Sequence, residues 1–308
     1  MNDLPAAFFD STFNRLSYSE LRRLQKSLNS PCLAYHIEKR VEFSFHLKHL
    51  RRNPSKPWQY AFKFSPLDGK RHSDLDNEIA TLDQFDCRYM RFTSINFYNE
   101  RQNEVDISSW LGPTTTDIIL KSILPFVLSR LTTSFKTLQL KCREYIPFLE
   151  KLTLSGHVFE DIALVYCGPI CLEFLRHSLA FHSIQRLSLD GNWPQCVIRD
   201  LEQYILSKRP QRLAIYIDEA EIRISMEFIS KLLEKANIDE KFTLFMRFKY
   251  ALEEGELTNH EKLHQTVRRR KDHQEWIVNN RRIVYLKEHG VDGEYYVLRI
   301  CSTSTIFV

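Results

Sequence analysis

Four short apolar stretches recur along the middle of the chain: Leu138-Gln139-Leu140, Ile162-Ala163-Leu164, Leu187-Ser188-Leu189 and Leu213-Ala214-Ile215. They begin at positions 138, 162, 187 and 213, so successive stretches are 24, 25 and 26 residues apart. A regular period of this length is typical of solenoids, in which strand-helix units stack because a single unit cannot bury its apolar face alone. The pattern predicts an α/β fold with an extended surface that suits a macromolecular partner better than a small substrate.

The segments between these stretches have apolar residues at helical spacing, which predicts one helix after each of the later strands. The residues expected on the buried helical faces are Leu172, Leu175 and Leu179, then Val197, Leu201, Tyr204 and Ile205, then Met226, Ile229 and Leu233. Leu244 and Met246 resume the strand pattern. Alternating strands and helices at this period predict a solenoid of leucine-rich-repeat-like type.

Strands and helices are also expected on both sides of the repeats. Arg91 to Phe97 reads as a strand, and Thr114 to Leu131 reads as a helix that Pro125 can kink. Near the C-terminus, strand-like segments surround turn residues, which predicts an antiparallel hairpin that protects the edge of the last repeat strand. These segments are Trp276 to Val278, Ile283 to Leu286, the turn Gly290 to Gly293, and Tyr295 to Ile300.

The N-terminal part differs in pattern from the repeats. Residues 1–45 have apolar residues at spacings that predict two or three short amphipathic helices. Residues 46–90 contain several prolines and are expected to form a linker, in which Trp58 to Phe64 alternates enough for a short strand. We therefore expect a helical segment at 1–45, a linker and lead-in at 46–90, and the repeat-like body at 91–308.

Composition is that of a folded protein, because 43% of the 308 residues are hydrophobic and 27% are charged. No apolar run reaches the length of a membrane span, and the N-terminus lacks the basic opening of a secretory signal. Seven cysteines, an odd and scattered set, fit reduced thiols. We expect a cytoplasmic or nuclear protein, or one found in both compartments.

Cysteine and charge patterns favour neither a metal site nor nucleic acid. Cys167 and Cys171 lie close in sequence, but no second pair with zinc-finger spacing accompanies them, so we expect structural thiols and no cofactor. The net charge of +4 is small for this length. The basic run Arg268 to Lys271 is expected to be a solvated loop or helix end, with nuclear import or phosphate contact as alternatives.

Sequence motifs give little support for an enzyme. The eight glycines form no phosphate-binding loop and no dinucleotide fingerprint, so we expect no catalytic activity. One short string, His260-Glu261-Lys262-Leu263-His264, does fit the H-E-x-x-H pattern of zinc hydrolases, in which two histidines hold zinc and the glutamate activates water. His273 and Glu275 lack the spacing of a known third ligand, so a zinc hydrolase is a remote alternative.

The segment Leu4 to Leu24 resembles an F-box. That family opens with a Leu-Pro pair, continues with apolar residues that end a first helix, and places leucines along a second helix; the matching positions are Leu4, Pro5, Phe13, Leu16, Leu21 and Leu24. The family's Val-Cys-Lys-x-x-Trp stretch is represented here by Ser27 to Leu33, which contains Pro31 and Cys32.

The rest of the chain resembles the nematode-expanded families of F-box-associated proteins. The resemblance rests on Phe8 to Ser11, Ile123 to Val127, Leu187 to Pro194, and Tyr295 to Ile300. It implies a non-catalytic substrate-recognition adaptor of a Skp/cullin/F-box ubiquitin ligase. The alternative is an interaction scaffold without ubiquitin-ligase coupling.

The resemblance also implies which residues contact the Skp-type adaptor: Leu4, Pro5, Phe8, Phe13, Leu16, Leu21 and Leu24. Alternatively, these side chains pack onto the first repeat. A protein target would bind the repeat body through outward-facing side chains, such as Gln139, Lys141, Ser188 and Asp190, or through the loop around Trp193. The alternative for Trp193 is that it belongs to a packed turn.

Overall fold

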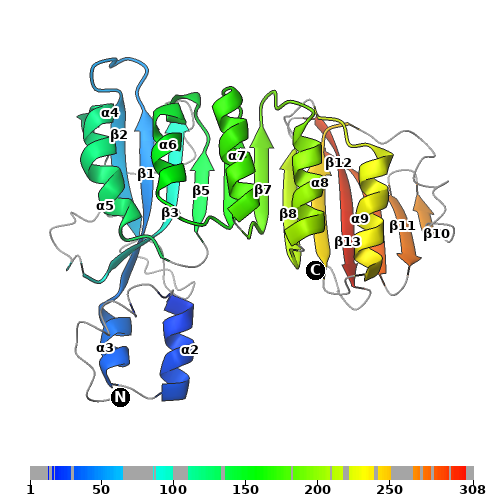
Figure 1. Cartoon of the computed structure of the whole chain (residues 1–308), viewed down its shortest axis with the longest axis horizontal. Coiled ribbons are helices and arrows are strands. Elements are labelled where there is room, and N and C mark those ends of the chain that lie inside the picture. The colour runs from blue at the N-terminus through cyan, green and yellow to red at the C-terminus, as the bar shows by residue number, and fades with distance from the viewer. Residues whose placement is uncertain are drawn as a thin grey trace. The chain divides into compact units, whose positions relative to one another are not determined.

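The computed structural model describes residues 13, 16, 18–28, 31–64, 86, 88–99, 110–132, 136–181, 183–208, 210–217, 222–238, 242–250, 266–270, 273–278, 281–290 and 293–302. The chain forms two compact units, residues 1–161 (unit 1) and 162–308 (unit 2), coloured blue to green and green to red in Figure 1. Each unit combines helices with parallel and antiparallel strand pairs. The fold is therefore mixed α/β, in agreement with the class that the sequence predicts.

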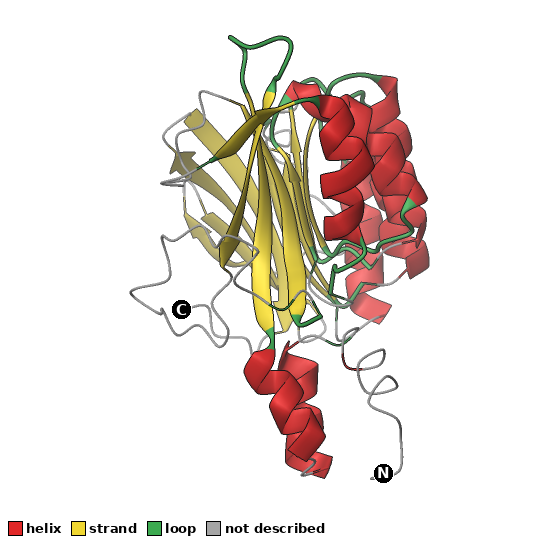
Figure 2. Cartoon of the chain, turned by 90° about the vertical axis from the view of Figure 1, so that its left-hand side faces the viewer, coloured by secondary structure: helices red, strands yellow, loops and turns green. Residues whose placement is uncertain are grey.

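Unit 1 begins with two helices and continues into a mixed sheet with strand order β5-β3-β1-β2-β4. The helices are α2 (Tyr18–Leu28), α3 (Pro31–Lys39), α4 (Thr116–Ile118), α5 (Leu124–Leu128) and α6 (Ile146–Leu154), with a π-helical turn η3 (Ile119–Ile123) and a 3-10 turn η4 (Arg143–Tyr145). The strands are β1 (Val41–His49), β2 (Trp58–Phe64), β3 (Met90–Asn99), β4 (Leu111–Thr114) and β5 (Thr137–Leu140). Figure 2 shows helices gathered on one face of the strands, with α2 and α3 beyond one end of β1.

The helical segment expected at 1–45 and the linker expected at 46–90 are both wrong where they meet, because residues 41–49 form strand β1. Strand β1 starts at Val41 and pairs with β2 as an antiparallel hairpin, in which His49 lies opposite Trp58. Alternation explains the strand, because Phe43, Phe45 and Leu47 share one face and are all fully buried. The prolines between the two strands mark only the hairpin loop. The strand expected at Trp58 to Phe64 is confirmed as β2, and the strand expected at Arg91 to Phe97 is confirmed as β3.

The helix expected at Thr114 to Leu131 is confirmed over Thr116–Leu128, with an irregular centre. The N–H of Leu124 donates to the carbonyl of Ile119, five residues earlier, which makes one π-helical turn. Pro125 follows directly and has no N–H to continue the regular ladder. The irregularity therefore falls at the proline that the sequence identifies as a kink.

The first apolar stretch, Leu138 to Leu140, is strand β5 of unit 1, and the later repeats belong to unit 2. Its elements alternate in the order β6 (Asp161–Val165), α7 (Pro169–Phe181), β7 (Arg186–Asp190), α8 (Val197–Lys208), β8 (Arg212–Ile217), α9 (Met226–Ile238) and β9 (Thr243–Phe248). Strands β6, β7, β8 and β9 are neighbours in that order, and β7-β8 and β8-β9 are parallel pairs. The strands and helices expected after Ile162 are confirmed.

Register aligns the apolar residues of these strands into one layer. Leu187 lies opposite Ile215, and Leu213 lies opposite Leu244. These side chains are buried together with the inward faces of the helices, for example Leu175 on α7, since all have less than a tenth of their surface exposed. The opposite face of β7, β8 and β9 carries the half-buried and exposed side chains.

Four antiparallel strands complete unit 2: β10 (Thr266–Arg270), β11 (His273–Val278), β12 (Arg281–Gly290) and β13 (Gly293–Ser302). The hairpin β12-β13 is confirmed, and β13 pairs antiparallel with β9, so it covers the edge of the last parallel strand. The loop or helix end expected at Arg268 to Lys271 is wrong for residues 268–270. They form strand β10, because their backbone pairs with β11.

Of the helices that the structure describes, none combines the length and the apolar character that crossing a membrane requires.

Candidate binding surfaces

The N-terminal helices have a small core of their own. Phe13, Leu21, Leu33 and Ile37 are buried against one another, and Leu16 and Leu24 pack on them while partly exposed. Two of the residues expected to contact an adaptor, Phe13 and Leu21, therefore lie inside this helical segment. The stripe that the sequence shows on α2 is covered mainly by α3.

Aromatic rings and one buried arginine join this segment to the strands of unit 1. The ring of His36 lies 5.4 Å from that of Phe13 and 5.4 Å from that of Tyr89, just before β3. Arg40 donates to the carboxylate of Glu42 at 2.9 Å and to the carbonyl of Phe13 at 3.4 Å. Burial lowers the pKa of Arg40, although the carboxylate of Glu42 acts in the opposite direction. These contacts join Phe13 and α3 to the start of β1 and to Tyr89, the residue before β3.

Two large apolar side chains on these helices are exposed. Leu28 at the end of α2 is 41% exposed, and Tyr35 on α3 is 50% exposed, with the Lys39 ammonium 5.9 Å from its ring centroid. Leu4, Pro5 and Phe8, the remaining residues expected to contact an adaptor, lie outside the described residues. Sequence reasoning missed Tyr35, because the F-box resemblance extends only to Leu33, in the first turn of α3.

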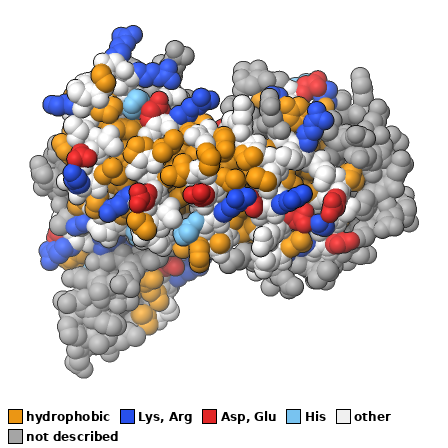
Figure 3. Space-filling view, turned by 45° about the horizontal axis from the view of Figure 1, so that its top comes forward, with side chains coloured by type: hydrophobic (Ala, Val, Ile, Leu, Met, Phe, Trp, Pro, Cys, Tyr) orange, Lys and Arg blue, Asp and Glu red, His pale blue; other side chains and the backbone are white. Residues whose placement is uncertain are grey.

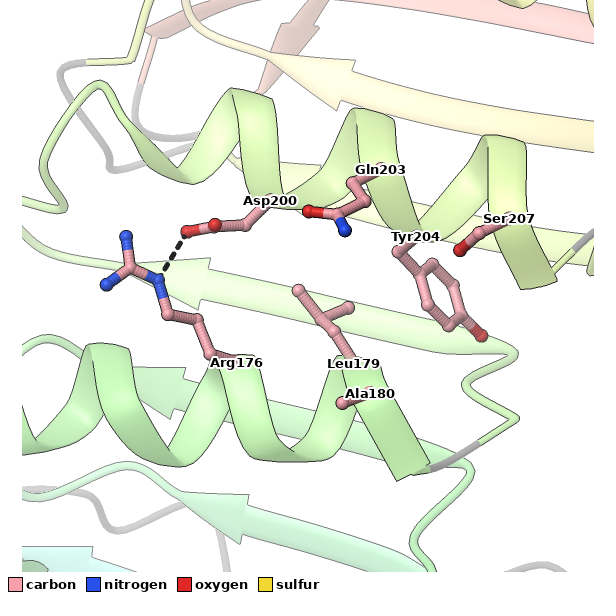
Figure 4. Close-up of a pocket in the computed structure, with 7 residues that line it drawn as sticks. All are labelled: Arg176, Leu179, Ala180, Asp200, Gln203, Tyr204 and Ser207. Atoms are coloured by element: carbon pink, nitrogen blue, oxygen red, sulfur yellow. Dashed lines mark hydrogen bonds and ion pairs between the residues drawn. The ribbon is translucent and has the colours of Figure 1, made fainter.

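The outer surface of unit 2 contains a shallow groove between α7 and α8 (Figure 4). Its volume is about 400 Å³, and its lining combines apolar and polar side chains: Arg176, Leu179, Ala180, Asp200, Gln203, Tyr204 and Ser207. An ion pair closes one end, where Arg176 Nε donates to Asp200 Oδ2 at 3.0 Å. Both partners are partly exposed, so the pair contributes little stability.

The hydroxyl of Tyr204, in the lining of this groove, is held by the backbone of Ile184. It accepts from the N–H of Ile184 at 2.7 Å and donates to the carbonyl of the same residue at 3.0 Å. Burial raises the pKa of Tyr204 to about 12, so the phenol stays protonated. The side chain therefore connects α8 to the segment that leads into β7.

Apolar side chains are exposed on the same outer helices. Phe181 at the end of α7 is 70% exposed and Leu206 on α8 is 41% exposed. Figure 3 shows hydrophobic side chains among scattered charges on one face of the molecule. Singly exposed apolar residues are common on protein surfaces and do not by themselves mark a binding site.

The other face of the unit 2 strands carries a group of interleaved aromatic and arginine side chains, which we name the aromatic-arginine cluster: Tyr216, Phe245, Arg247, Tyr295 and Arg299. The guanidinium of Arg247 lies 5.2 Å from the ring centroids of both Tyr216 and Tyr295. That of Arg299 lies 5.2 Å from the centroid of Phe245, whose ring is 5.3 Å from that of Tyr216. All five side chains are half-buried.

Strand pairing explains the cluster. Tyr216 on β8 lies opposite Arg247 on β9, which in turn lies opposite Val297 on β13. Tyr216, Phe245 and Arg247 follow the alternation of their strands, so the sequence contains part of the signal. It does not show that β13 lies beside β9, which brings Tyr295 and Arg299 into the cluster.

The strand-face residues expected to be available to a target are half-buried. Gln139 and Lys141 belong to unit 1, and Ser188 and Asp190 belong to β7 in unit 2. Trp193 is a packed turn residue, because only 3% of its surface is exposed and its ring lies 5.1 Å from that of Tyr166. Of the two expectations for Trp193, the packed turn therefore agrees with the structure.

Thiols and metal-ligating side chains form no centre in the part of the chain that the structure describes. Cys167 and Cys171, at the turn from β6 into α7, are not in a disulfide, and no group of three or more potential metal ligands occurs among the described residues. Burial raises the pKa of Cys142 to about 12 and also raises that of Cys301, which makes both thiols poor nucleophiles. The string His260 to His264 lies outside the described residues.

Comparisons of the chain with protein-family models, with curated proteins and with solved structures gave no match.

Proposed function

We propose that this chain is a non-catalytic substrate-recognition adaptor of a Skp/cullin/F-box ubiquitin ligase. Its N-terminal helices bind a Skp-type adaptor, and its strand-helix repeats, arranged as a leucine-rich-repeat-like solenoid, bind a protein target. The observation that carries the proposal is that the fold has two parts of different construction. A helical segment with its own core is attached to a regular array of strand-helix units.

The separate core of the helical segment supports adaptor binding. The segment does not need a partner in order to fold, because it buries its own core residues, Phe13, Leu21, Leu33 and Ile37, against one another. Its exposed apolar surface is then available to another protein's helices. In this proposal Leu4, Pro5 and Phe8 contact the adaptor together with the exposed Tyr35, while Phe13 and Leu21 hold the helices in place.

The array of repeats supports target binding. In these parallel strands every second side chain points away from the helices. Neighbouring repeats place such side chains next to one another, so together they form one continuous surface. A partner recognises a surface of this kind through the surface's side chains. The backbone beneath them moves little when the partner binds. The repeats therefore suit recognition of a protein rather than chemistry on a small molecule.

Co-purification with a Skp-type adaptor tests this function. The full-length chain is expected to capture the adaptor, and Leu4→Asp combined with Pro5→Asp is expected to abolish capture. Tyr35→Asp is expected to weaken capture, because a buried unpaired carboxylate at an interface costs several kcal/mol. Phe181→Asp is the matched control, since it places the same charge on an exposed aromatic residue of unit 2.

Capture that survives the Leu4 and Pro5 changes would contradict the proposed docking surface. Absence of capture by the unmodified chain would favour the second candidate function, an interaction scaffold without ubiquitin-ligase coupling. One observation favours that candidate: helix α3 begins at Pro31, within the stretch where the sequence departs from the F-box pattern.

A further inference from the structure

We propose that the end of unit 1 formed by the β1-β2 loop binds the phosphate backbone of double-stranded nucleic acid, independently of base sequence. This surface, which we name the hairpin surface, consists of the loop that joins β1 to β2, the last residues of β1, and the residues that follow β5 as far as the η4 turn. Its basic side chains are Lys48, Arg51, Arg52, Lys56, Lys141 and Arg143. The hairpin surface belongs wholly to unit 1, and its role does not depend on the ubiquitin-ligase proposal.

The basic residues of the hairpin are not balanced by acidic residues in the same stretch. No aspartate or glutamate occurs between Glu42 and Asp68, whereas this stretch contains five lysines and arginines. Their charge exceeds the formal net charge of +4 of all 308 residues. The small overall charge of the chain therefore conceals a local concentration of positive charge, which is the usual electrostatic mark of nucleic acid binding.

The positive excess persists when the neighbouring segments are counted. Even if the charges of residues 100–109, which connect β3 to β4, and of the start of α4 are all assigned to this end, basic residues outnumber acidic ones by eight to five. They are Lys48, Arg51, Arg52, Lys56, Arg101, Lys121, Lys141 and Arg143 against Glu100, Glu104, Asp106, Asp117 and Glu144. Asp117 forms an ion pair with Lys121 at 2.6 Å, and Glu144 Oε1 lies 3.7 Å from His49 Nδ1. A polyanion that approaches this end therefore meets net positive charge.

Several cations of the hairpin surface are available to a ligand. Arg52, Lys56 and Arg143 are exposed, and their side chains have no ion pair or hydrogen bond among the described residues. The half-buried side chain of Lys141 likewise has none there. Arg51 makes a contact of its own and is not counted among these donors. Phosphate oxygens can therefore accept hydrogen bonds from the four side chains without displacing a carboxylate.

Hydrogen bonds within the hairpin hold the loop in a defined conformation. The side-chain oxygen of Asn53 accepts from the N–H of Lys56 and from the hydroxyl of Ser55, both at 3.1 Å. At the base of the loop, the N–H of Leu50 donates to the carbonyl of Pro57 at 2.6 Å. Figure 1 shows this loop projecting beyond the ends of the neighbouring strands of unit 1, and Figure 3 shows basic side chains around it. The loop can therefore approach a ligand without obstruction by those strands.

Strand pairing extends the positive charge from the loop onto the sheet. Lys48 on β1 lies opposite Tyr98 on β3, and Lys141 follows the residue of β5 that lies opposite Phe97. One strand separates the two lysines, which corresponds to about 10 Å across the sheet. Cations spread along a surface in this way suit a chain of phosphates better than one small anion.

The same features favour a duplex over a membrane or a single strand. Stable membrane binding needs an apolar anchor in addition to basic residues, and the described residues of the loop and of η4 include no exposed large apolar side chain. Single strands bind by stacking their bases on aromatic rings. Of the described rings nearest the loop, Trp58 is buried, and the Lys48 ammonium lies over Trp110, 5.6 Å from its centroid. A duplex backbone needs only cations at the surface.

Fluorescence anisotropy of a labelled short DNA duplex with the full-length chain, measured over a range of salt concentrations, tests the proposal. Combined Arg52→Gln and Lys56→Gln is expected to weaken binding roughly ten- to sixtyfold at about 0.1 M salt and to lower the slope of log K against log salt by about 2, since each phosphate contact contributes about 0.9. Combined Arg23→Gln and Lys26→Gln is the matched control, because it removes one exposed arginine and one exposed lysine from α2 in the same unit. A folding defect would reduce the amount of active protein without changing the slope.

Weaker binding and a smaller slope for the hairpin variant, with both unchanged for the α2 variant, would support the proposal. Equal effects of the two variants would overturn it, and so would absence of duplex binding by the unmodified chain. Tighter binding to anionic lipid vesicles, to a single strand of the same length or to polyglutamate would also overturn it. A second duplex of different sequence is expected to bind equally well, and a preference of roughly tenfold or more would overturn sequence independence.

Discussion

A buried histidine makes the stability of unit 1 sensitive to pH. His46 on β1 is 6% exposed, and its ring stacks on that of Tyr98 at 5.8 Å with an interplanar angle of 9°. Neither ring nitrogen has a hydrogen-bond partner among the described residues. Burial, with a smaller contribution from the positive charge of Lys63, lowers the pKa of His46 from 6.5 to about 4. The folded chain thus disfavours the protonated ring.

The sign and size of the effect follow from proton binding. Between about pH 6.5 and pH 4 the unfolded chain binds a proton at His46 and the folded chain does not, so acid favours unfolding. Relative to about pH 7.5, where the ring is neutral in both states, the free energy of unfolding falls by about 2 kcal/mol at pH 5. The loss levels off at about 3 kcal/mol below pH 4, where both states are protonated.

Urea unfolding at about pH 7.5 and about pH 5, followed by tryptophan fluorescence, measures this difference. Carboxylates and other groups titrate in every variant, so the comparison with His46→Phe isolates the histidine. That variant keeps an aromatic ring and is expected to lose about 2 kcal/mol less between the two pH values. His289→Asn, at a side chain that is 69% exposed, is the control and should behave like the unmodified chain. Equal losses for the unmodified chain and His46→Phe would refute the reasoning.

Three further predictions concern single side chains. Tyr204→Phe leaves the N–H and carbonyl of Ile184 without their partner and should lower the unfolding free energy by about 1 to 3 kcal/mol in urea; no change would show that water replaces the hydroxyl. Leu21→Ala opens the core of the N-terminal helices at a cost of about 2 to 5 kcal/mol, so limited proteolysis should cut α2 and α3 sooner while unit 2 stays intact. In the native chain a thiol reagent should label the exposed Cys196 and spare the buried Cys142, whose pKa is about 12; labelling of both at one rate would contradict the burial of Cys142.

Local patterns predicted most elements of unit 2 correctly. The apolar stretches at Leu187 and Leu213 are strands β7 and β8, and the helical spacing from Val197 to Ile205 is helix α8. The apolar residues that give these predictions lie within a few residues of one another. Their spacing, every 2 residues in a strand and every 3.6 in a helix, follows from backbone geometry alone. The same logic failed at β1, because the prolines of the hairpin loop after it favour a linker when the sequence is considered alone.

Candidate sites were harder to predict, because a stripe of apolar residues does not state what covers it. Spacing on α2 indicates that Leu21 and Leu24 face one direction, yet both an adaptor and another helix could cover that face. The structure places Leu33 and Ile37 of α3 there. Tyr35, on the exposed side of α3, became a candidate only when the buried side was known.

Residue order thus specified the strands and helices of the repeats and the alternation that directs Phe245 and Arg247 to one side of β9. Tertiary structure decided which strands lie next to each other: β13 lies beside β9, although strands β10, β11 and β12 separate them along the chain. Pairing across such a separation depends on the packing of the whole sheet, and no short sequence window contains it. For that reason the aromatic-arginine cluster, assembled from three strands, is a property of the fold and not of any one segment.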